Sequence, residues 1–282
     1  MSLGLKLAKE LAHFRTHHIA YYTKDPIFLY QMGKVGSTAV EIGLRARGLA
    51  VRHIHSLGGD YADQFRFRRA RAPLVGRLRK RALGLVHAQL LRWPNRPAKV
   101  ITLVREPLAR NIAAFFQLLR RVLWEEPRFD TRKDIGALEL IADTFHRYYR
   151  HLTPLTWFET EIHRRLGIDV FAHPFDPARG WSRIRQGNID LLVLRQENLE
   201  ACAPVIAEFA GVDRLELSPV NLGERKWYAG LYRDFRAGYV PAPEMIDQLY
   251  ASRFMQHFYS AAETAEFRRR WLRRELAPPV AA

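Results

Sequence analysis

The segment QMGKVGST, residues 31–38, gathers side chains that suit an anion. Lys34 supplies an ammonium group, and Ser37 and Thr38 supply two hydroxyl donors. Gly36 allows close approach between the backbone and a ligand. The chemistry that this spacing predicts is the binding of a phosphate or a similar anion.

Three elements around this segment must position it. Residues 27–31 form an apolar run typical of a buried strand, residues 36–47 have helical spacing, and residues 50–54 indicate a second short strand. Strand, helix and strand in this order are typical of a parallel sheet. A strand-to-helix turn exposes backbone N–H groups at the positive end of the helix dipole, where phosphate binds readily. A turn that binds no ligand is the alternative.

A second strand-to-helix junction follows in VREPLARNIAAFF. Residues 99–104 read as a strand covered on both faces, and Pro107 suits the first position of a helix. Arg105 lies between them and offers a guanidinium that suits phosphate. Alternatively, it forms a surface ion pair with Glu106 or with another neighbour.

Together the two junctions resemble those of sulfotransferases that use 3′-phosphoadenosine 5′-phosphosulfate (PAPS). The spacing K-x-G-[ST]-T resembles their 5′-phosphosulfate loop, whereas a Walker A loop would place the lysine after its second glycine. The second junction resembles their R-x-P-x-x-R-x-x-S-x-[FY] segment. Ala113 departs from it, because the family has a serine there that holds the 3′-phosphate. Either Arg105 and backbone groups hold the 3′-phosphate instead, or the affinity for the cofactor is weak, or the cofactor differs.

The resemblance implies a role for each matching residue. Lys34 would contact the 5′-phosphate and the bridging oxygen, and Arg105 would hold the 3′-phosphate beside position Ala113. Lys226 is a further candidate at the edge of the site. The rest of the cradle would come from Val35, Gly36, Ser37 and Thr38.

Two histidines in VRHIHSL are candidates for the base. His53 and His55 lie two residues apart at the end of the second strand and so share a face. Related sulfotransferases carry a Glu or His base at a comparable distance beyond the loop lysine, and that register favours His55. A neutral imidazole accepts a proton near pH 7. No metal is expected, because neither HExxH nor a carboxylate triad accompanies the pair.

A narrower resemblance covers residues 26–271. The segment ERKWYAGLY, residues 224–232, resembles the signature of the bacterial NKWYS family, which belongs to the sulfotransferase group and is linked to capsular polysaccharide synthesis. Arg225 and Ala229 depart from the Asn and Ser of that motif. Further segments resemble the family in the expected order: QMGKVGST, HIHSL, VREPLARNIAAFF, GIDVFAHPFD and LVLRQENL.

Composition favours an anionic partner. The chain of 282 residues carries 45 Lys plus Arg against 29 Asp plus Glu, a formal net charge of +16. Cys202 is the single cysteine, which excludes an intramolecular disulfide and a cysteine zinc cage. The chain lacks a signal-peptide pattern and a long apolar run, so we expect a cytosolic protein.

Three segments add to the predicted core. Residues 1–25 predict a basic amphipathic helix, either docked on the domain or in peripheral contact with a membrane. Residues 56–98 predict an Arg-rich helical insert, with Leu74, Leu78, Leu83 and Leu90 on one stripe. It is either a solvated face or a surface for a polyanion. Residues 226–282 predict short C-terminal helices.

The fold class predicted for residues 1–282 is α/β, a single three-layer αβα domain with a central parallel sheet of four to five strands, the P-loop-like sulfotransferase fold. Residues 167–181 suggest a strand with a Pro-rich loop, and residues 188–199 a last buried strand leading into a helix. The predicted activity is PAPS-dependent sulfation of a hydroxyl on a glycan or small metabolite. A P-loop kinase, a polyanion- or nucleic-acid-binding protein and an inactive nucleotide-binding relative are the alternatives; nucleic acid is not the expected partner.

Overall fold

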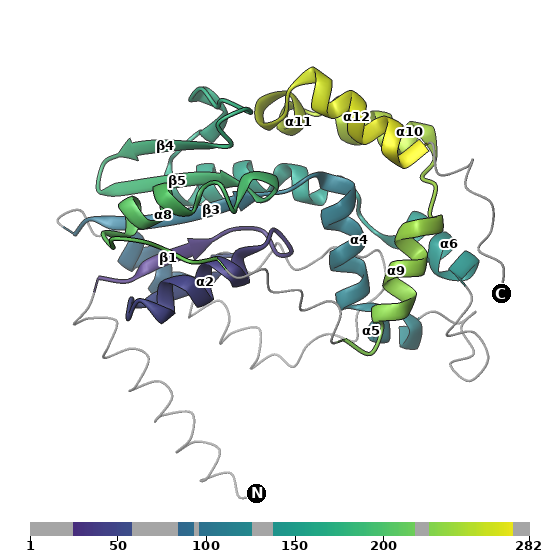
Figure 1. Ribbon diagram of the computed structural model, residues 1–282, viewed down its shortest axis with the longest axis horizontal. Helices are drawn as coiled ribbons and strands as arrows, with labels where there is room; N and C mark the ends of the chain where they lie inside the picture. The colour runs from purple at the N-terminus through teal and green to yellow at the C-terminus, as the bar shows by residue number, and fades with distance from the viewer. Residues whose placement is uncertain (1–24, 58–83, 93–95, 126–137, 218–225, 273–282) are drawn as a thin grey trace, which may run out of the picture.

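The computed structural model describes residues 25–57, 84–92, 96–125, 138–217 and 226–272 (Figure 1). The predicted helix at 1–25 lies outside these residues except for its last position. So does most of the insert predicted at 56–98, including Leu74, Leu78 and Leu83. The described part of that insert contains a helix at residues 84–91, in which Leu90 is buried.

A five-stranded sheet forms the centre of the fold. Its strands are β1 (Ile27–Tyr30), β2 (Val51–Ile54), β3 (Ala98–Val104), β4 (Trp181–Gln186) and β5 (Ile189–Arg195). Their order across the sheet is β2-β1-β3-β5-β4. Neighbouring strands β2, β1, β3 and β5 run parallel, with Ile27 opposite Val51 and Val100 opposite Leu191. The sheet confirms the α/β class and a strand count of five.

The parallel strands form where the sequence is apolar without alternation. Every residue of β1 is buried, as are all residues but one in β3 and in β5. Strands covered on both faces need such runs, since neither face meets water. The strands predicted at 27–31, 50–54, 99–104 and 188–199 are confirmed, each starting within about one residue of the expected position.

The predicted central parallel sheet of four to five strands is confirmed for β2, β1, β3 and β5, whereas the fifth strand, β4, pairs antiparallel with β5. The strand expected within residues 167–181 is wrong: this stretch holds a 3-10 helix, Val170–Ala172, followed by a loop. The actual strand is the polar WSRIRQ, in which Ile184 is the one buried residue. An edge strand has little apolar surface to cover, so its sequence gives a weak strand signal.

Some helices gather beyond the carboxyl ends of the parallel strands, and others lie along the strands (Figure 1). In chain order the helices are α2 (Ser37–Ala46), α4 (Pro107–Gln117), α5 (Leu119–Glu125), α6 (Leu138–Tyr148), the 3-10 helix Thr153–Thr156, the π-helix Phe158–His163, α7 (Arg164–Leu166), the 3-10 helix Val170–Ala172, the 3-10 helix Gln196–Asn198, α8 (Ala203–Ala210), α9 (Ala229–Gly238), α10 (Pro243–Tyr250), α11 (Arg253–Phe258) and α12 (Ala261–Leu272). Helix α4 packs with α9 through contacts of Phe116 with Tyr232 and Phe235. The segment predicted to form C-terminal helices contains α9 to α12 within its described residues.

The strand order creates a switch point between β1 and β3. The chain leaves β1 toward β2 on one side, while β3 and β5 extend the sheet on the other. In open parallel sheets, ligands bind outside the carboxyl ends of the strands at such a point. Both sequence junctions, residues 31–38 and the segment after Val104, lie at this edge.

None of the helices that the structure describes combines the length and apolar character needed to cross a bilayer.

Candidate functional site

The turn from β1 to α2 has the backbone of an anion cradle. Lys34 adopts φ 72° and Gly36 adopts φ 86°, so both lie in the left-handed region that L side chains rarely adopt. Gly36 is the N-cap of α2 and offers no side chain to its first N–H groups. The positive end of the helix is therefore left for a ligand.

A cavity of about 640 Å³ opens on this turn. That volume lies within the usual range for small-molecule sites. Of the candidate residues, Val35 is absent from the lining; its side chain is fully buried in the core, so it can contribute through its backbone alone. The candidates that line the cavity are Lys34, Gly36, Ser37, Thr38, His53, His55, Arg105, Ala113 and Lys226.

Lys34 lies in a strongly positive environment. Burial, together with the charges of Lys226, Arg105 and Arg110, lowers the pKa of Lys34 to about 8. Cations placed this close repel one another, and an anion between them would relieve that repulsion. The cavity is therefore suited to a multiply charged anion.

Two arginines from the β3–α4 junction hold the turn in place. The Arg105 guanidinium donates to the Lys34 carbonyl oxygen at 3.1 Å, and Arg110 Nε donates to the Gly33 carbonyl oxygen at 2.9 Å. Arg110 is buried and also donates to the Tyr149 hydroxyl at 2.8 Å. The alternative in which Arg105 forms an ion pair with Glu106 is not the arrangement seen, because Glu106 caps α4 by accepting from two backbone N–H groups.

The α4 wall of the cavity lacks a hydroxyl where the sulfotransferase pattern has one. Ala113 lines the cavity, and Gln117 lines it one helical turn further on. Residues four apart on a helix share a face, so the Gln117 amide is the next polar group available on this wall.

The two histidines differ in what their ring nitrogens contact. His55 Nδ1–H donates to the Gln31 carbonyl oxygen at 3.0 Å, and no described residue bonds to its Nε2. Both nitrogens of His53 are in contact, Nδ1 with Glu41 at 2.8 Å and Nε2 with Gln31 at 2.6 Å. His55 can accept a proton from a ligand at Nε2, whereas His53 is engaged by the protein.

The pKa of His55 is lowered. Burial is the main cause, and the charges of His53, Arg110 and Lys34 lower it further, while the bond to the Gln31 backbone opposes the change. At neutral pH the ring is therefore neutral, with its proton on Nδ1 and its lone pair on Nε2.

The wall contributed by α9 and the residues just before it is mostly new to the sequence interpretation. Tyr228, Tyr232 and Arg236 line the cavity beside Lys226, while Trp227 is 51% exposed and lies outside the lining. Tyr228, Tyr232 and Arg236 follow one another at intervals of four residues, which puts their side chains on one helical face. This spacing can be recognised in the sequence.

The end of β5 supplies acidic and amide groups to the cavity. Gln196, Glu197 and Glu200 line it, and Gln196 packs against the turn so closely that a Cβ on Gly36 would lie 2.8 Å from its Cγ. Burial raises the pKa of Glu197. Gln196 and Glu197 lie in the family-like segment LVLRQENL, but no role at the site was predicted for them or for Glu200 from the sequence.

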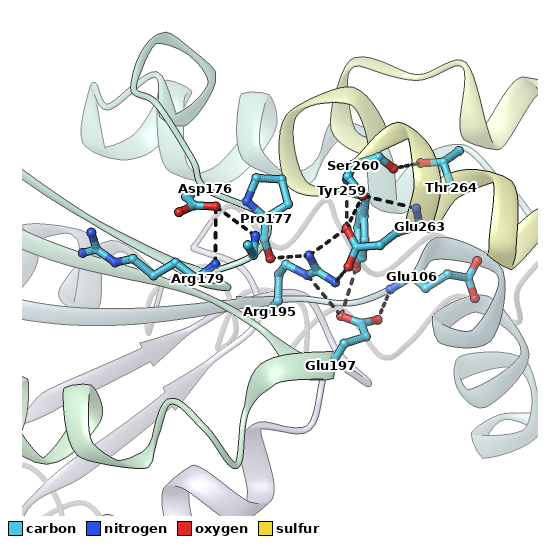
Figure 2. Close-up of polar contacts among 11 residues, drawn as sticks. Glu106, Asp176, Pro177, Arg179, Arg195, Glu197, Tyr259, Ser260, Glu263 and Thr264 are labelled. Carbon is cyan, nitrogen blue, oxygen red and sulfur yellow. Dashed lines mark hydrogen bonds and ion pairs between the residues drawn. The ribbon is translucent and has the colours of Figure 1, made fainter.

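A buried polar network ties the sheet to the C-terminal helices, as Figure 2 shows. Arg195 at the end of β5 donates to Glu263 of α12 at 2.5 Å and lies over the Tyr259 ring. Glu197 accepts from the backbone N–H of Glu106 at 2.8 Å and from the Tyr259 hydroxyl at 3.1 Å. The network joins the ends of β3 and β5 to the C-terminal helices through Glu197, which also lines the cavity.

Within the described residues, no group of three or more His, Cys, Asp or Glu side chains could hold a metal ion.

Comparison with known proteins gives a family match. A family model named NKWYS, described as "Putative capsular polysaccharide synthesis protein", matches residues 129–260. That range includes Lys226 and the α9 wall but not the β1–α2 turn or Arg105. A search of curated proteins gives no match. No solved structure matches either.

Proposed function

We propose that this protein is a sulfotransferase with a P-loop-like fold, which transfers the sulfuryl group of PAPS to a hydroxyl of a glycan or small metabolite. The observation that carries the proposal is the cationic β1–α2 turn at the switch point of the sheet. There Lys34, Arg105 and an uncapped helix N-terminus surround one cavity.

The residues of the cavity fit a nucleotide with several phosphates. Lys34, Ser37 and Thr38 would hold the 5′ end, and Arg105, with Lys226, would hold the 3′-phosphate. Ala113 offers no hydroxyl, so Gln117 on the same face of α4 would take that place. The mutual repulsion that helps to lower the pKa of Lys34 is what a bound polyanion would remove.

His55 is the proposed base. Bound PAPS would supply the sulfuryl group. In the transfer, the acceptor oxygen would bond to sulfur while the bond between sulfur and the phosphate oxygen of PAPS breaks. His55 Nε2 takes the acceptor's hydroxyl proton, and the Gln31 carbonyl fixes the tautomer that makes this possible. Lys34 stabilises the negative charge that grows on the phosphate oxygen.

The glycan acceptor is supported by the family match and by the α9 wall. The matched family is described by capsular polysaccharide synthesis. Tyr228, Tyr232 and Arg236 present phenol rings and a guanidinium to the cavity. Such groups stack on sugar rings and pair with acidic ones, so we propose that α9 contacts the acceptor.

Titration of the protein with adenosine 3′,5′-bisphosphate, beside ATP with magnesium, tests the donor site. We expect the bisphosphate to bind and to raise the melting temperature, with both effects lost in Arg105→Ala and kept in Arg233→Ala, an exposed arginine of α9. Affinity should fall as the pH rises through about 8, because Lys34 loses its proton there. Binding of ATP with magnesium in place of the bisphosphate would instead support the kinase alternative.

A further inference from the structure

A chain of four side chains runs behind the anion-binding turn. Glu41 Oε2 contacts His53 Nδ1 at 2.8 Å, and His53 Nε2 contacts Gln31 Nε2 at 2.6 Å. Gln31 Nε2 then contacts Ser37 Oγ at 2.7 Å. Gln31 is fully buried and Ser37 is 6% exposed, so the last bond, between these two side chains, is shielded from water.

The chain starts and ends on the same helix. Glu41 and Ser37 are four residues apart on α2 and therefore share a face. His53 of β2 and Gln31, which follows β1, close the ring from the sheet. The second oxygen of Glu41 accepts from Arg45 Nε at 3.0 Å, which orients the carboxylate toward the histidine.

The Gln31 amide turns its nitrogen, rather than its oxygen, toward His53 and Ser37, and Gln31 Oε1 has no hydrogen-bond partner among the described residues. With the amide in this orientation, the direction of each hydrogen bond follows from the groups at its ends. The Glu41 carboxylate accepts, so His53 Nδ1 must donate, and a neutral ring then has its lone pair on Nε2. Gln31 Nε2 carries two hydrogens, one for His53 Nε2 and one for Ser37 Oγ. His53 Nε2 also lies 3.2 Å from Ser37 Oγ, but its one lone pair is already taken by the shorter contact with Gln31.

These hydrogen bonds leave the hydroxyl hydrogen of Ser37 unused. Its oxygen accepts from Gln31, and its own hydroxyl hydrogen is not required by that bond. Ser37 lines the cavity at the first position of α2, where the helix has no side-chain cap. The hydroxyl is thus left to donate into the cavity.

We propose that Glu41, His53 and Gln31 are positioning residues that fix the Ser37 hydroxyl as a hydrogen-bond donor to the bound anion. Bonds from a neutral donor to a charged acceptor are among the stronger ones, and they depend on the donor's direction. The identity of the anion rests on the proposed function, but the arrangement itself does not. It also assigns the two histidines different tasks: His55 moves a proton and His53 holds one.

A double-mutant cycle with adenosine 3′,5′-bisphosphate tests this proposal. We expect Ser37→Ala to weaken binding about tenfold to a hundredfold, and Glu41→Ala and His53→Ala to weaken it about tenfold. In the Ser37→Ala background, His53→Ala should add less than about twofold, because its effect acts through Ser37. Additive losses would overturn the proposal, as would full affinity in either positioning variant.

Two controls separate positioning from general damage. Arg45→Gln removes the other partner of Glu41 and should change affinity less than His53→Ala does. Thermal melting of each variant reports folding, and a loss of affinity at unchanged melting temperature supports positioning.

If the bisphosphate fails to bind while inorganic sulfate binds, the proposed function fails and the same cycle is measured with sulfate. If neither anion binds, both proposals fail.

Nitrogen NMR of the ligand-free protein tests the chain without any ligand. We expect the His53 ring to carry its proton on Nδ1 in the wild type and to lose this preference in Glu41→Ala. A ring protonated on Nε2 in the wild type would contradict the proposal, since that nitrogen could not accept from Gln31.

Discussion

The charges of His55 and Lys34 depend on their burial and, to a smaller extent, on the cations around them. Lys34 is held in left-handed backbone by two arginine contacts to the turn's carbonyl groups. Burial and neighbouring cations lower the pKa of Lys34 and that of His55. Lys34 therefore keeps the charge that binds an anion up to a pH of about 8, while the His55 ring is neutral at neutral pH and can accept a proton.

Replacing His55 tests its role as the base. We expect His55→Ala to lower the rate of transfer by about 10²- to 10⁴-fold, the usual contribution of a general base. Affinity for the bisphosphate should stay unchanged, since the lost imidazole does not hold the donor. Because the pKa of His55 is lowered, the wild-type rate should fall off only below the ordinary histidine range as pH decreases.

The pH-rate profile of His53→Ala is the matched control. It should keep the acidic limb of the wild type while binding the donor less well. If the acidic limb of the pH-rate profile survives in His55→Ala and disappears in His53→Ala, then His53 is the base and His55 is not.

At the scale of elements, the turn between β1 and α2 depends on glycine at one position. Gly36 needs φ 86°, and a Cβ there would also meet Gln196. Gly48, after α2, needs φ 76°, but an added Cβ would have nothing within 4 Å. An alanine at Gly48 would therefore meet backbone strain alone, whereas an alanine at Gly36 would meet both backbone strain and crowding by Gln196.

We expect Gly48→Ala to lower the free energy of unfolding by about 1 kcal/mol, the usual cost of left-handed backbone for a side chain. Gly36→Ala should cost about 1 kcal/mol more, and Gln196→Ala in the same chain should recover that excess. Chemical denaturation measures both effects. Equal losses for the two glycines would show that Gln196 moves aside without cost.

The elements that can be predicted from the sequence are those whose residues carry a strong local signal. The apolar runs of β1, β3 and β5 exist because both faces of those strands are covered, and Pro107 begins α4 as its ring geometry favours. The polar edge strand β4 has no such signal, so the sequence does not predict it. Its position depends on pairing with β5, which is a property of the sheet rather than of the segment.

The site divides in the same way. Lys34, Ser37 and Arg105 stand out because their motifs are contiguous in the sequence, and they line one cavity. Glu41 and Gln31 do not stand out, because their significance comes from contacts with His53, which the fold brings near. No local pattern in the sequence indicates that a glutamine buried behind a turn orients a serine.

At the scale of the whole molecule, the Arg195 network joins the sheet to the last described helix. Arg195 is 2% exposed and pairs with Glu263. A buried charge that loses its partner is costly, because its desolvation is then uncompensated. The end of β5, which leads into the cavity-lining residues Gln196 and Glu197, therefore depends on a helix that lies far along the chain from it.

Glu263→Gln should lower the free energy of unfolding by about 2 kcal/mol, since the charged hydrogen bonds to Arg195 are lost. Glu266→Gln, on the exposed side of α12, should change it by less than about 0.5 kcal/mol. Burial would raise the pKa of Glu263, but its bonds with Arg195 and Ser260 outweigh burial and lower it. The stabilisation should therefore be complete above the usual glutamate range and decline as pH falls below it.

Thermal melting from neutral pH down to about pH 3, below the usual glutamate range, measures this difference. The gap between wild type and Glu263→Gln should narrow toward low pH, where the wild-type carboxylate takes up its proton. If the difference in melting temperature between wild type and Glu263→Gln stays constant with pH, the Arg195–Glu263 pair stabilises the fold through packing rather than through charge.

The most direct test of the central claim is transfer of labelled sulfuryl from PAPS to a panel of acidic and neutral polysaccharides. We predict label in at least one polysaccharide, dependent on Lys34 and absent with Lys34→Ala at unchanged melting temperature. Transfer that persists in Lys34→Ala would contradict the assigned mechanism. No transfer to any acceptor, together with no release of adenosine 3′,5′-bisphosphate, would contradict the proposal that this protein is a sulfotransferase.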